Sequence, residues 1–278
     1  MDQVMTAGTE LDALRPEIWS ANFYPTLLEA LPFNDSVARS YENEIKALGD
    51  IVNITSFPQF SDAQEVQEGE KVDAEGITAA NTQLTVNKML VKDFIVTDLA
   101  QIQTIDASNA LRDLAYHSIL KKMQSIIISL IVPSSSSPDH SIAFDSGTTL
   151  GLADILEAKE LLDGADVPDS GRNMILGAAQ WNDIFNITGL TSRDFVNGAS
   201  MESGALPSSV LGFMPKMTSE AGNVSYFFHP IFMQIAVQKA LSVKVYDMGG
   251  QGYRQARVNS TLLFGAKQVS NLRVVTIG

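Results

Sequence analysis

The side chains most able to do chemistry are scattered rather than grouped in this 278-residue chain. The absence of cysteine excludes disulfides, thiolate nucleophiles, iron–sulfur clusters and cysteine zinc sites. Only three histidines occur, at His117, His140 and His229. His117 lies within a helical pattern and His229 precedes a proline, and neither has a second histidine at metal-ligand spacing. Packing or helix capping is therefore favoured for both.

Other short patterns fall short of known ligand loops. Gly249-Gly250-x-Gly252 lacks the spacing and the strand–turn–helix context of a phosphate-binding loop, and it favours a hairpin turn. Asp163, Asp166 and Asp169 lack the glycine and terminal glutamate of a calcium loop, and they favour a helix exit. No Gly-x-Ser-x-Gly elbow occurs, and we expect Trp19 and Trp181 to be core or interface anchors. We predict no catalytic site, no cofactor and no metal, so the protein is not expected to be an enzyme.

The first half of the chain predicts an arm, a hairpin and a long helix. Proline positions predict helical turns after Pro16 and from Pro25 through Leu31. Alternating apolar residues predict strands at 50–55, 84–87 and 91–96. The residues between the first two strands, 59–82, are acidic and small, so a long β-hairpin arm is predicted. A helix is then predicted over 107–132, with apolar residues from Leu111 and Leu114 to Leu130 on one face.

The second half predicts a mixed α+β unit. We expect a helix from about 149 to Gly164, a buried strand at 172–177 and a short helix at 178–185. A further helix is predicted from Pro230 to about Ala240, because apolar residues recur there at helical spacing. Strands are predicted last, at 243–246, 255–264 and 272–277.

Charge is distributed unevenly along the chain. The formal net charge is −13 and only 18% of residues are charged, against about 25% in an average domain. Residues 1–80 hold fifteen acids and four bases, whereas residues 231–278 hold one acid and six bases. The acid-rich stretch contains Asp62, Glu65, Glu68, Glu70, Asp73 and Glu75 with the single base Lys71, and the C-terminal bases are Lys239, Lys244, Arg254, Arg257, Lys267 and Arg273.

Two interpretations of this asymmetry stay open. Blocks of like charge are usually solvated, so the acidic stretch and the basic end can be unrelated surfaces. Alternatively, the acidic stretch of one subunit lies over the basic end of the next, a heterologous contact that generates rings and shells. In this second interpretation all thirteen of these charged residues, together with Trp19, are inter-subunit contacts.

The sequence predicts neither membrane insertion nor secretion. The N-terminus lacks the basic and apolar regions of a secretory signal, and the longest apolar run, 126–132, is far shorter than the roughly 20 residues of a membrane span. An acidic chain also repels phosphate, so binding to nucleic acid through its overall field is not expected. We expect a product that stays in the cytoplasm in which it is made.

The order of these parts resembles that of tailed-phage major capsid proteins of the Hong Kong 97-type fold. In the first half, the resemblance rests on Tyr41-Glu42-Asn43-Glu44-Ile45 leading to Gly49–Ile54, Gly69 in the acidic loop, and Lys88-x-x-Val91-x-Asp93-Phe94-x-Val96-x-Asp98. In the second half, it rests on Leu161-Leu162-Asp163, Val167-Pro168, Gly171-Arg172-x-Met174-Ile175-Leu176, and Phe228-His229-Pro230 with Ala236.

The resemblance implies a division of the chain into known parts. Residues 1–48 correspond to an N-terminal arm, 49–90 to the extended loop and its strands, and 91–148 to a peripheral domain with its spine helix at 107–132. Residues 149–240 correspond to an axial domain, and the strands of 241–278 return to the peripheral domain.

The resemblance further implies a function in assembly. Many copies would form the pentamers and hexamers of an icosahedral phage head that encloses double-stranded DNA without reading its sequence. The protein would be a virion component assembled in the host cytoplasm, with a portal as a partner and scaffolding or cement proteins as further candidate partners. Two alternatives stay open at this point: an encapsulin-like compartment shell and a phage tail or baseplate protein.

Overall fold

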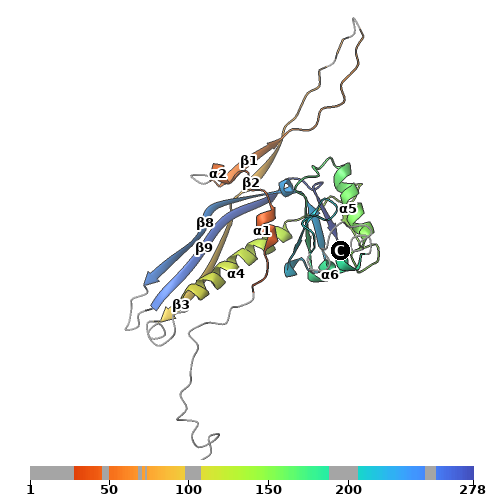
Figure 1. Cartoon of the computed structure of the whole chain (residues 1–278). Coiled ribbons are helices and arrows are strands. Elements are labelled where there is room, and N and C mark those ends of the chain that lie inside the picture. The colour runs from red at the N-terminus through yellow and green to blue at the C-terminus, as the bar shows by residue number, and fades with distance from the viewer. Residues whose placement is uncertain are drawn as a thin grey trace, which may run out of the picture.

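The computed structural model describes residues 28–45, 50–67, 71–72, 74–97, 108–187, 206–247 and 255–278. Within these residues, a body built on two sheets carries a β-hairpin that projects well beyond it (Figure 1). The long strands β8 (Met233–Asp247) and β9 (Gln255–Gln268) run beside helix α4 (Ser108–Ser129) (Figure 1). Helices α5 (Leu152–Gly164) and α6 (Ala178–Asn186) lie at the other end of the body (Figure 1).

The long sheet has three antiparallel strands in the order β3-β9-β8. Its strands are β3 (Lys88–Thr97), β8 (Met233–Asp247) and β9 (Gln255–Gln268). The strands predicted at 91–96, 243–246 and 255–264 are confirmed, and each is longer than predicted. The expected turn around Gly250 lies outside the described residues.

The helix predicted from Pro230 to Ala240 is wrong. Only Pro230–Phe232 forms a turn of 3-10 helix, η3, and β8 then begins at Met233. The apolar residues there fit both helical and strand spacing, and the β-branched Ile235 and Val237 favour the strand. Pairing with β9 along 233–247 decides the outcome, and one strand therefore crosses the domain boundary expected at residue 240.

Helix α4 (Ser108–Ser129) confirms the predicted spine helix. Ala115, Ile119, Met123 and Ile127 recur every four residues and are buried, so this stripe faces the long sheet and the core. The N-terminal part of the predicted apolar face is different, because Leu111 and Leu114 are exposed.

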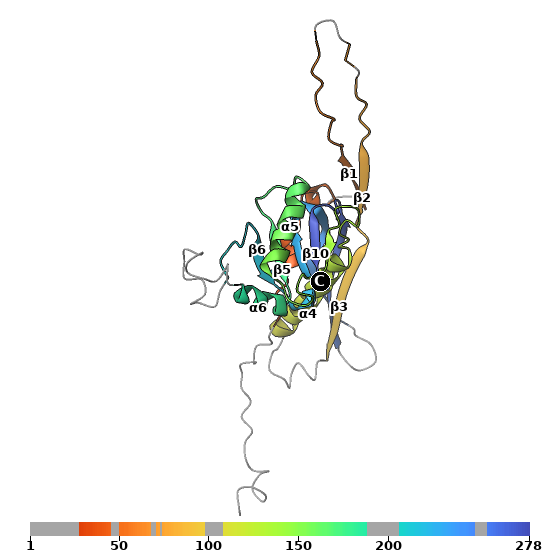
Figure 2. The same cartoon turned by 90° about the vertical axis from the view of Figure 1, so that its right-hand side faces the viewer.

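The second sheet has five strands in the order β4-β10-β7-β5-β6. They are β4 (Ser141–Ile142), β5 (Asn173–Leu176), β6 (Met214–Met217), β7 (Ser225–Phe228) and β10 (Val274–Ile277). Helices α5 (Leu152–Gly164) and α6 (Ala178–Asn186) lie against this sheet, and they confirm two predicted helices (Figure 2).

Both faces of the five-stranded sheet are covered, which explains its continuously apolar strands. Met174 and Phe227 pack in the cluster formed with α5 and α6, whereas Ile175 and Phe228 pack in the cluster formed with α4. The same alternation occurs in β10, where Val274 faces α4 and its neighbour faces the other cluster. Alternate residues of one strand thus serve two cores.

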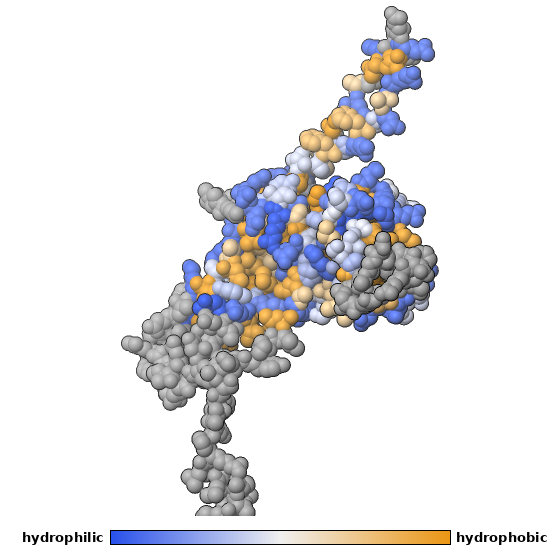
Figure 3. All heavy atoms as spheres, viewed as in Figure 1, coloured by the Kyte–Doolittle hydropathy of each residue, from blue (hydrophilic) through white to orange (hydrophobic). Residues whose placement is uncertain are grey.

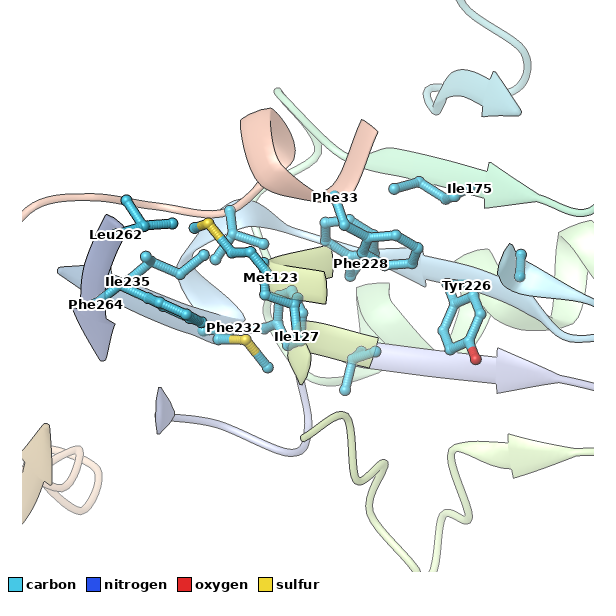
Figure 4. Close-up of a cluster of buried hydrophobic side chains, with 14 of the residues drawn as sticks. Phe33, Met123, Ile127, Ile175, Tyr226, Phe228, Phe232, Ile235, Leu262 and Phe264 are labelled. Carbon is cyan, nitrogen blue, oxygen red and sulfur yellow. The ribbon is translucent and has the colours of Figure 1, made fainter. Parts of the chain in front are cut away.

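An aromatic cluster joins the two sheets to the N-terminal segment. Phe33 of helix α1 (Pro32–Ser36) stacks on Phe228, with ring centroids 5.8 Å apart, and meets Tyr226 edge-on at 5.3 Å (Figure 4). Met123 and Ile127 of α4 lie in the same cluster, which continues to Phe264 of β9 (Figure 4). Burying aromatic rings contributes strongly to core stability, so α1 fastens the two sheets together.

The helical turn predicted from Pro25 through Leu31 is wrong over 28–31, which form no helix. The structure has α1 starting at Pro32, which occupies the first turn where a missing N–H is tolerated, rather than a helix ending there. The turn predicted after Pro16 lies outside the described residues.

The predicted hairpin is confirmed, with its second strand earlier than expected. β1 (Ile51–Ser56) pairs antiparallel with β2 (Ala80–Thr85), from Ile51 opposite Thr85 to Ser56 opposite Ala80. Val52, Ile54 and Leu84 are buried at the base of the hairpin, together with Ile45 of the short helix α2 (Glu42–Ile45) and Ala236 of β8.

The hairpin base crosses the long sheet at Gly265. A Cβ atom on Gly265 would lie 2.4 Å from the carbonyl oxygen of Thr85 and 2.9 Å from the Cα of Val86. Only a residue without a side chain permits this backbone approach. On the neighbouring strand β8, the small Ala236 lies opposite Gly265 and also leaves room for the hairpin base. This crossing sets where the hairpin leaves the body.

The variant Gly265→Ala should destabilise the protein by about 1–3 kcal/mol, because its methyl group meets rigid backbone at the hairpin base. Urea unfolding followed by circular dichroism measures this change. Gly164→Ala is the matched control, since nothing lies within 4 Å of the position of its Cβ atom. Its stability should stay within about 1 kcal/mol of the parent chain. Equal stability for Gly265→Ala and the parent would contradict the close crossing.

Candidate assembly surfaces

The distal part of the hairpin has no core of its own. Beyond Ser56 and before Ala80, the described residues form no strand, and all of them are exposed. Phe57 and Phe60 are 71% and 64% exposed, and Val72 on the returning limb is 58% exposed. Large apolar side chains that alternate with acids along an extended arm are typical of a segment that is covered by a partner.

The predicted acidic stretch lies on this arm. Asp62, Glu65, Lys71 and Glu75 are all exposed, whereas Glu68, Glu70 and Asp73 lie outside the described residues. The Glu75 carboxylate accepts hydrogen bonds from the backbone N–H of Ser61 (3.2 Å) and from its hydroxyl (2.7 Å). This contact ties the two limbs together beyond the last strand pair.

The face of the long sheet opposite α4 combines apolar and basic residues. We name this side, which also carries the base of the chain's own hairpin, the outer sheet face. Met89, Val91 and Ile95 alternate along β3 and are exposed on it. The projecting arm also carries apolar residues among hydrophilic ones (Figure 3).

Four of the predicted basic residues share the outer sheet face. In the register, Arg257 lies opposite Ile95, Lys244 opposite Asn259, and Lys239 opposite Leu263. Lys267 is two residues beyond Gly265 on the same strand and is exposed. Arg254 and Trp19 lie outside the described residues.

The basic residues differ in whether a neighbouring acidic side chain compensates their charge. Arg257 donates from Nε to the Asp93 carboxylate at 3.1 Å, and Asn259 donates to the same carboxylate, so this charge is largely compensated within the chain. Lys239 donates to the Thr261 hydroxyl at 2.9 Å. Arg273 stands apart, because it ends the turn before β10 and its carbonyl accepts from the N–H of His229, which follows β7 of the five-stranded sheet.

A polar junction fixes the segment that leads into α1. The Glu29 carboxylate lies 2.6 Å from Lys121 Nζ and accepts a hydrogen bond from the Ser219 hydroxyl. His117 Nε2 donates to the Glu29 carbonyl at 3.0 Å, and Gln124 accepts from the N–H of Phe33 at 3.3 Å. The hydrogen bonds from Lys121 and Ser219 hold the pKa of Glu29 below its ordinary value, and the same contact raises the pKa of Lys121.

This junction was not predicted. Its partners are separated by about 90 to 190 residues in the chain, and each residue type is ordinary on a solvated helix. No local pattern could have identified Glu29, Lys121 or Gln124.

Asp163, Asp166 and Asp169 lie at the end of α5 and in the loop after it, as predicted for a helix exit. Two of them contact Arg172, a pairing that was not predicted. Asp163 lies 2.6 Å from Arg172 Nη2, and Asp169 lies 3.6 Å from Nη1. Arg172 is 1% exposed and also donates to the carbonyls of Val167 and Pro168. The carboxylates therefore neutralise a buried guanidinium rather than face an open ion site.

The histidines also have structural contacts. His229 Nδ1 accepts from the N–H of Ile231 at 3.4 Å and caps η3, and His117 secures the Glu29 segment, as predicted for packing or capping residues. Burial, reinforced by the nearby Arg273, lowers the pKa of His229. His140 is fully buried, and its Nδ1 lies 3.1 Å from the Val274 carbonyl.

Among the described residues, no group of histidines and carboxylates is arranged to hold a metal ion. Within the same ranges, no helix combines the length and the apolar character that crossing a bilayer requires.

Solved structures from phages, including two described as capsids, share this architecture. A chain from Mycobacterium phage Che8 superposes with a TM-score of 0.76 at 21% identity, covering 95% of this chain and 97% of that one. The capsid of cyanophage P-SCSP1u gives 0.76 at 12% identity over 99% and 96%, and the cyanophage Pam1 capsid gives 0.75 at 13% over 100% and 98%. The fold is therefore the Hong Kong 97-type fold of icosahedral shells.

The family follows from the sequence itself. Residues 49–278 match the family model described as phage capsid protein, and the chain belongs to this family. Its role is that of a major capsid protein, a structural component of the virion. Among curated proteins, none matches the sequence significantly.

The variant Glu29→Gln should loosen the segment that leads into α1 near neutral pH. Because the pKa of Glu29 is lowered in the folded protein, its contribution is present above the ordinary carboxyl range and is lost as pH falls through the lower folded value. Hydrogen exchange of the α1 amides should be faster in the variant at pH 7, and the difference should narrow at acidic pH, below the ordinary carboxyl pKa of about 4.3.

Glu157→Gln is the control for this experiment, because Glu157 is exposed on α5, away from the junction. Its α1 amides should exchange as in the parent chain at both neutral and acidic pH. Identical exchange of Glu29→Gln and the parent at pH 7 would show that the carboxylate does not hold the segment.

Proposed function

We propose that this chain assembles into the pentamers and hexamers of a closed icosahedral head that encloses double-stranded DNA. The observation that carries the proposal is the exposed, aromatic and acidic distal hairpin, which no other part of the described structure covers. Membership of the phage capsid family supports the same role.

The proposed contact places the distal hairpin of one copy on the outer sheet face of the next. Phe57 and Phe60 then meet the apolar stripe of Met89, Val91 and Ile95, and burial of this area supplies the main stabilisation. The acids of the arm meet Lys244 and Lys267, and among the described residues no acidic side chain lies within ion-pair distance of either. Exposed ion pairs each contribute only about 0–1 kcal/mol, so charge selects the register and repetition around the shell gives the effect.

A contact of this kind joins different surfaces of two copies. The arm projects away from the body of its own chain (Figure 1), and among the described residues no ion pair connects it to the outer sheet face. Heterologous contacts close into rings when the rotation between copies closes. Pentamers and hexamers are such rings.

The division of the chain into parts follows the same proposal. Residues 1–48 form the arm, 49–90 the extended loop, 91–148 the peripheral domain and 149–240 the axial domain, with the return to the peripheral sheet starting at Met233 rather than at 241. Assembly in the host cytoplasm, a portal partner and separate scaffolding or cement proteins complete the proposal.

Electron microscopy of the expressed protein tests the proposed function. Closed icosahedral particles are expected. Rods or monodisperse small oligomers would contradict it, and closed particles that copurify with an enzyme and never contain DNA would instead support a cargo compartment.

A charge exchange tests the proposed contact. Glu68→Lys with Glu70→Lys should lower the yield of particles at least severalfold, because lysines on the arm repel the basic outer sheet face. Adding Lys244→Glu and Lys267→Glu to the same chain should restore part of the yield, since opposite charges again face each other. Circular dichroism of each variant controls for folding. Unchanged yield in the first variant, or no recovery in the combined variant, would rule out this pairing.

A further inference from the structure

A hollow of about 420 Å³ lies between α4 and β3, on the side of the long sheet away from the hairpin base. Its wall contains three ammonium groups and two hydroxyls, from Lys92, Lys121, Lys122, Ser118 and Ser125. Its apolar floor comes from β3 and α4, and Glu220 is the one carboxylate in its lining. The polar wall therefore offers mostly hydrogen-bond donors.

The charges of this hollow are only partly compensated. Lys121 is paired with Glu29, as described above. Lys92 and Lys122 are exposed, and among the described residues no acid is recorded within ion-pair distance of either. Lys88 lies on the same face of β3, two alternations from Lys92, and Arg112 is exposed on α4. A local excess of bases in a chain of net charge −13 requires an explanation.

The two sides of the long sheet have different surroundings. The outer sheet face carries the hairpin base and the apolar stripe, which the proposed function assigns to contacts between copies. The α4 side has a polar, positively charged hollow instead. A donor-rich site of this kind fits an anion whose oxygens only accept hydrogen bonds, and flexible lysines suit repeated phosphates without a fixed register.

We propose that the hollow between α4 and β3 contacts backbone phosphates of the packaged duplex, so that the α4 side lines the interior of the shell. This inference rests on the proposed function, because it takes the enclosed polymer to be DNA. The net negative charge of the chain keeps the overall attraction weak, and the hollow provides one local point of contact in each subunit.

Amine labelling of intact heads tests the proposal. Filled heads and emptied heads are treated with a small amine-reactive reagent, and the modified lysines are measured by peptide mass spectrometry. Lys92 and Lys122 should be labelled severalfold less in filled heads, whereas Lys244 and Lys267 should be labelled equally in both. Equal labelling of Lys92 and Lys122 in filled and emptied heads would overturn the proposal. Strong protection in both states would also overturn it, because it would indicate a protein occupant.

Charge-reversed variants give an independent test on unassembled full-length protein. Binding of a short DNA duplex is measured by fluorescence anisotropy at several salt concentrations. Affinity falls as salt rises, so the slope of log affinity against log salt is negative. Lys92→Glu with Lys122→Glu should make this slope shallower by about 1.8, as expected for two lost phosphate contacts. Lys244→Glu with Lys267→Glu changes the net charge equally on the opposite face, and it should leave this slope nearly unchanged. Equal effects of the two pairs would contradict a local site.

Microscopy of the Lys92→Glu, Lys122→Glu variant distinguishes failure of the DNA contact from failure of shell assembly. Closed particles from this variant leave the proposed function standing whatever the DNA measurements give. If the parent chain itself forms no closed particle, the proposed function is contradicted, and the DNA contact that rests on it is contradicted as well.

Discussion

The distal half of the hairpin cannot bury its own aromatic side chains, and the rest of the structure is organised around this constraint. Two strands alone are marginally stable in water, and beyond Ser56 the limbs lack even the ladder of strand hydrogen bonds. The Ser61–Glu75 contact joins the limbs but buries nothing. The arm therefore has to be held rigidly at its base and covered elsewhere, which is the condition of a subunit that is completed by its neighbours.

The body supplies the rigid base. Gly265 and Ala236 let the hairpin backbone lie directly on the long sheet, so that the buried residues around Leu84 fix its direction. Below this crossing, α4 packs its buried stripe against both sheets, and Phe33 closes the aromatic cluster between them. A firmly packed body can present the arm and the outer sheet face in a constant relation, which a repeating shell requires.

Local patterns were sufficient for much of this fold. Alternation identified β1 and β3, a continuous apolar run identified β5, and helical spacing identified α4 and α5, because each of these elements buries one clear face or is apolar throughout. The segment after Pro230 was misjudged, since Ile231, Ile235 and Val237 fit a helix and a strand equally and only the pairing with β9 distinguishes them. Contacts between residues far apart in the chain leave no recognisable pattern in the sequence. The Gly265 crossing, the Glu29–Lys121 pair and the buried Arg172 all depend on segments that meet only in the folded chain.

The fold shows which of the C-terminal basic residues share one surface. The C-terminal bases were expected to act together, and the structure places Lys239, Lys244, Arg257 and Lys267 on one sheet face but Arg273 in the turn before a strand of the other sheet. Arg257 is already compensated by Asp93, whereas Lys239, Lys244 and Lys267 have no acidic side chain within ion-pair distance among the described residues. Composition could count these bases, but only strand register could show which of them face the same way.

Hydrogen exchange of the distal hairpin, compared between unassembled and assembled protein, tests most directly whether other copies complete the arm. Amides of the limbs between Ser56 and Ala80 should exchange rapidly in the unassembled chain and become strongly protected in the shell, together with those of β3. Rapid exchange of the limbs in both states would contradict the central claim, because it would mean that the arm stays uncovered after assembly.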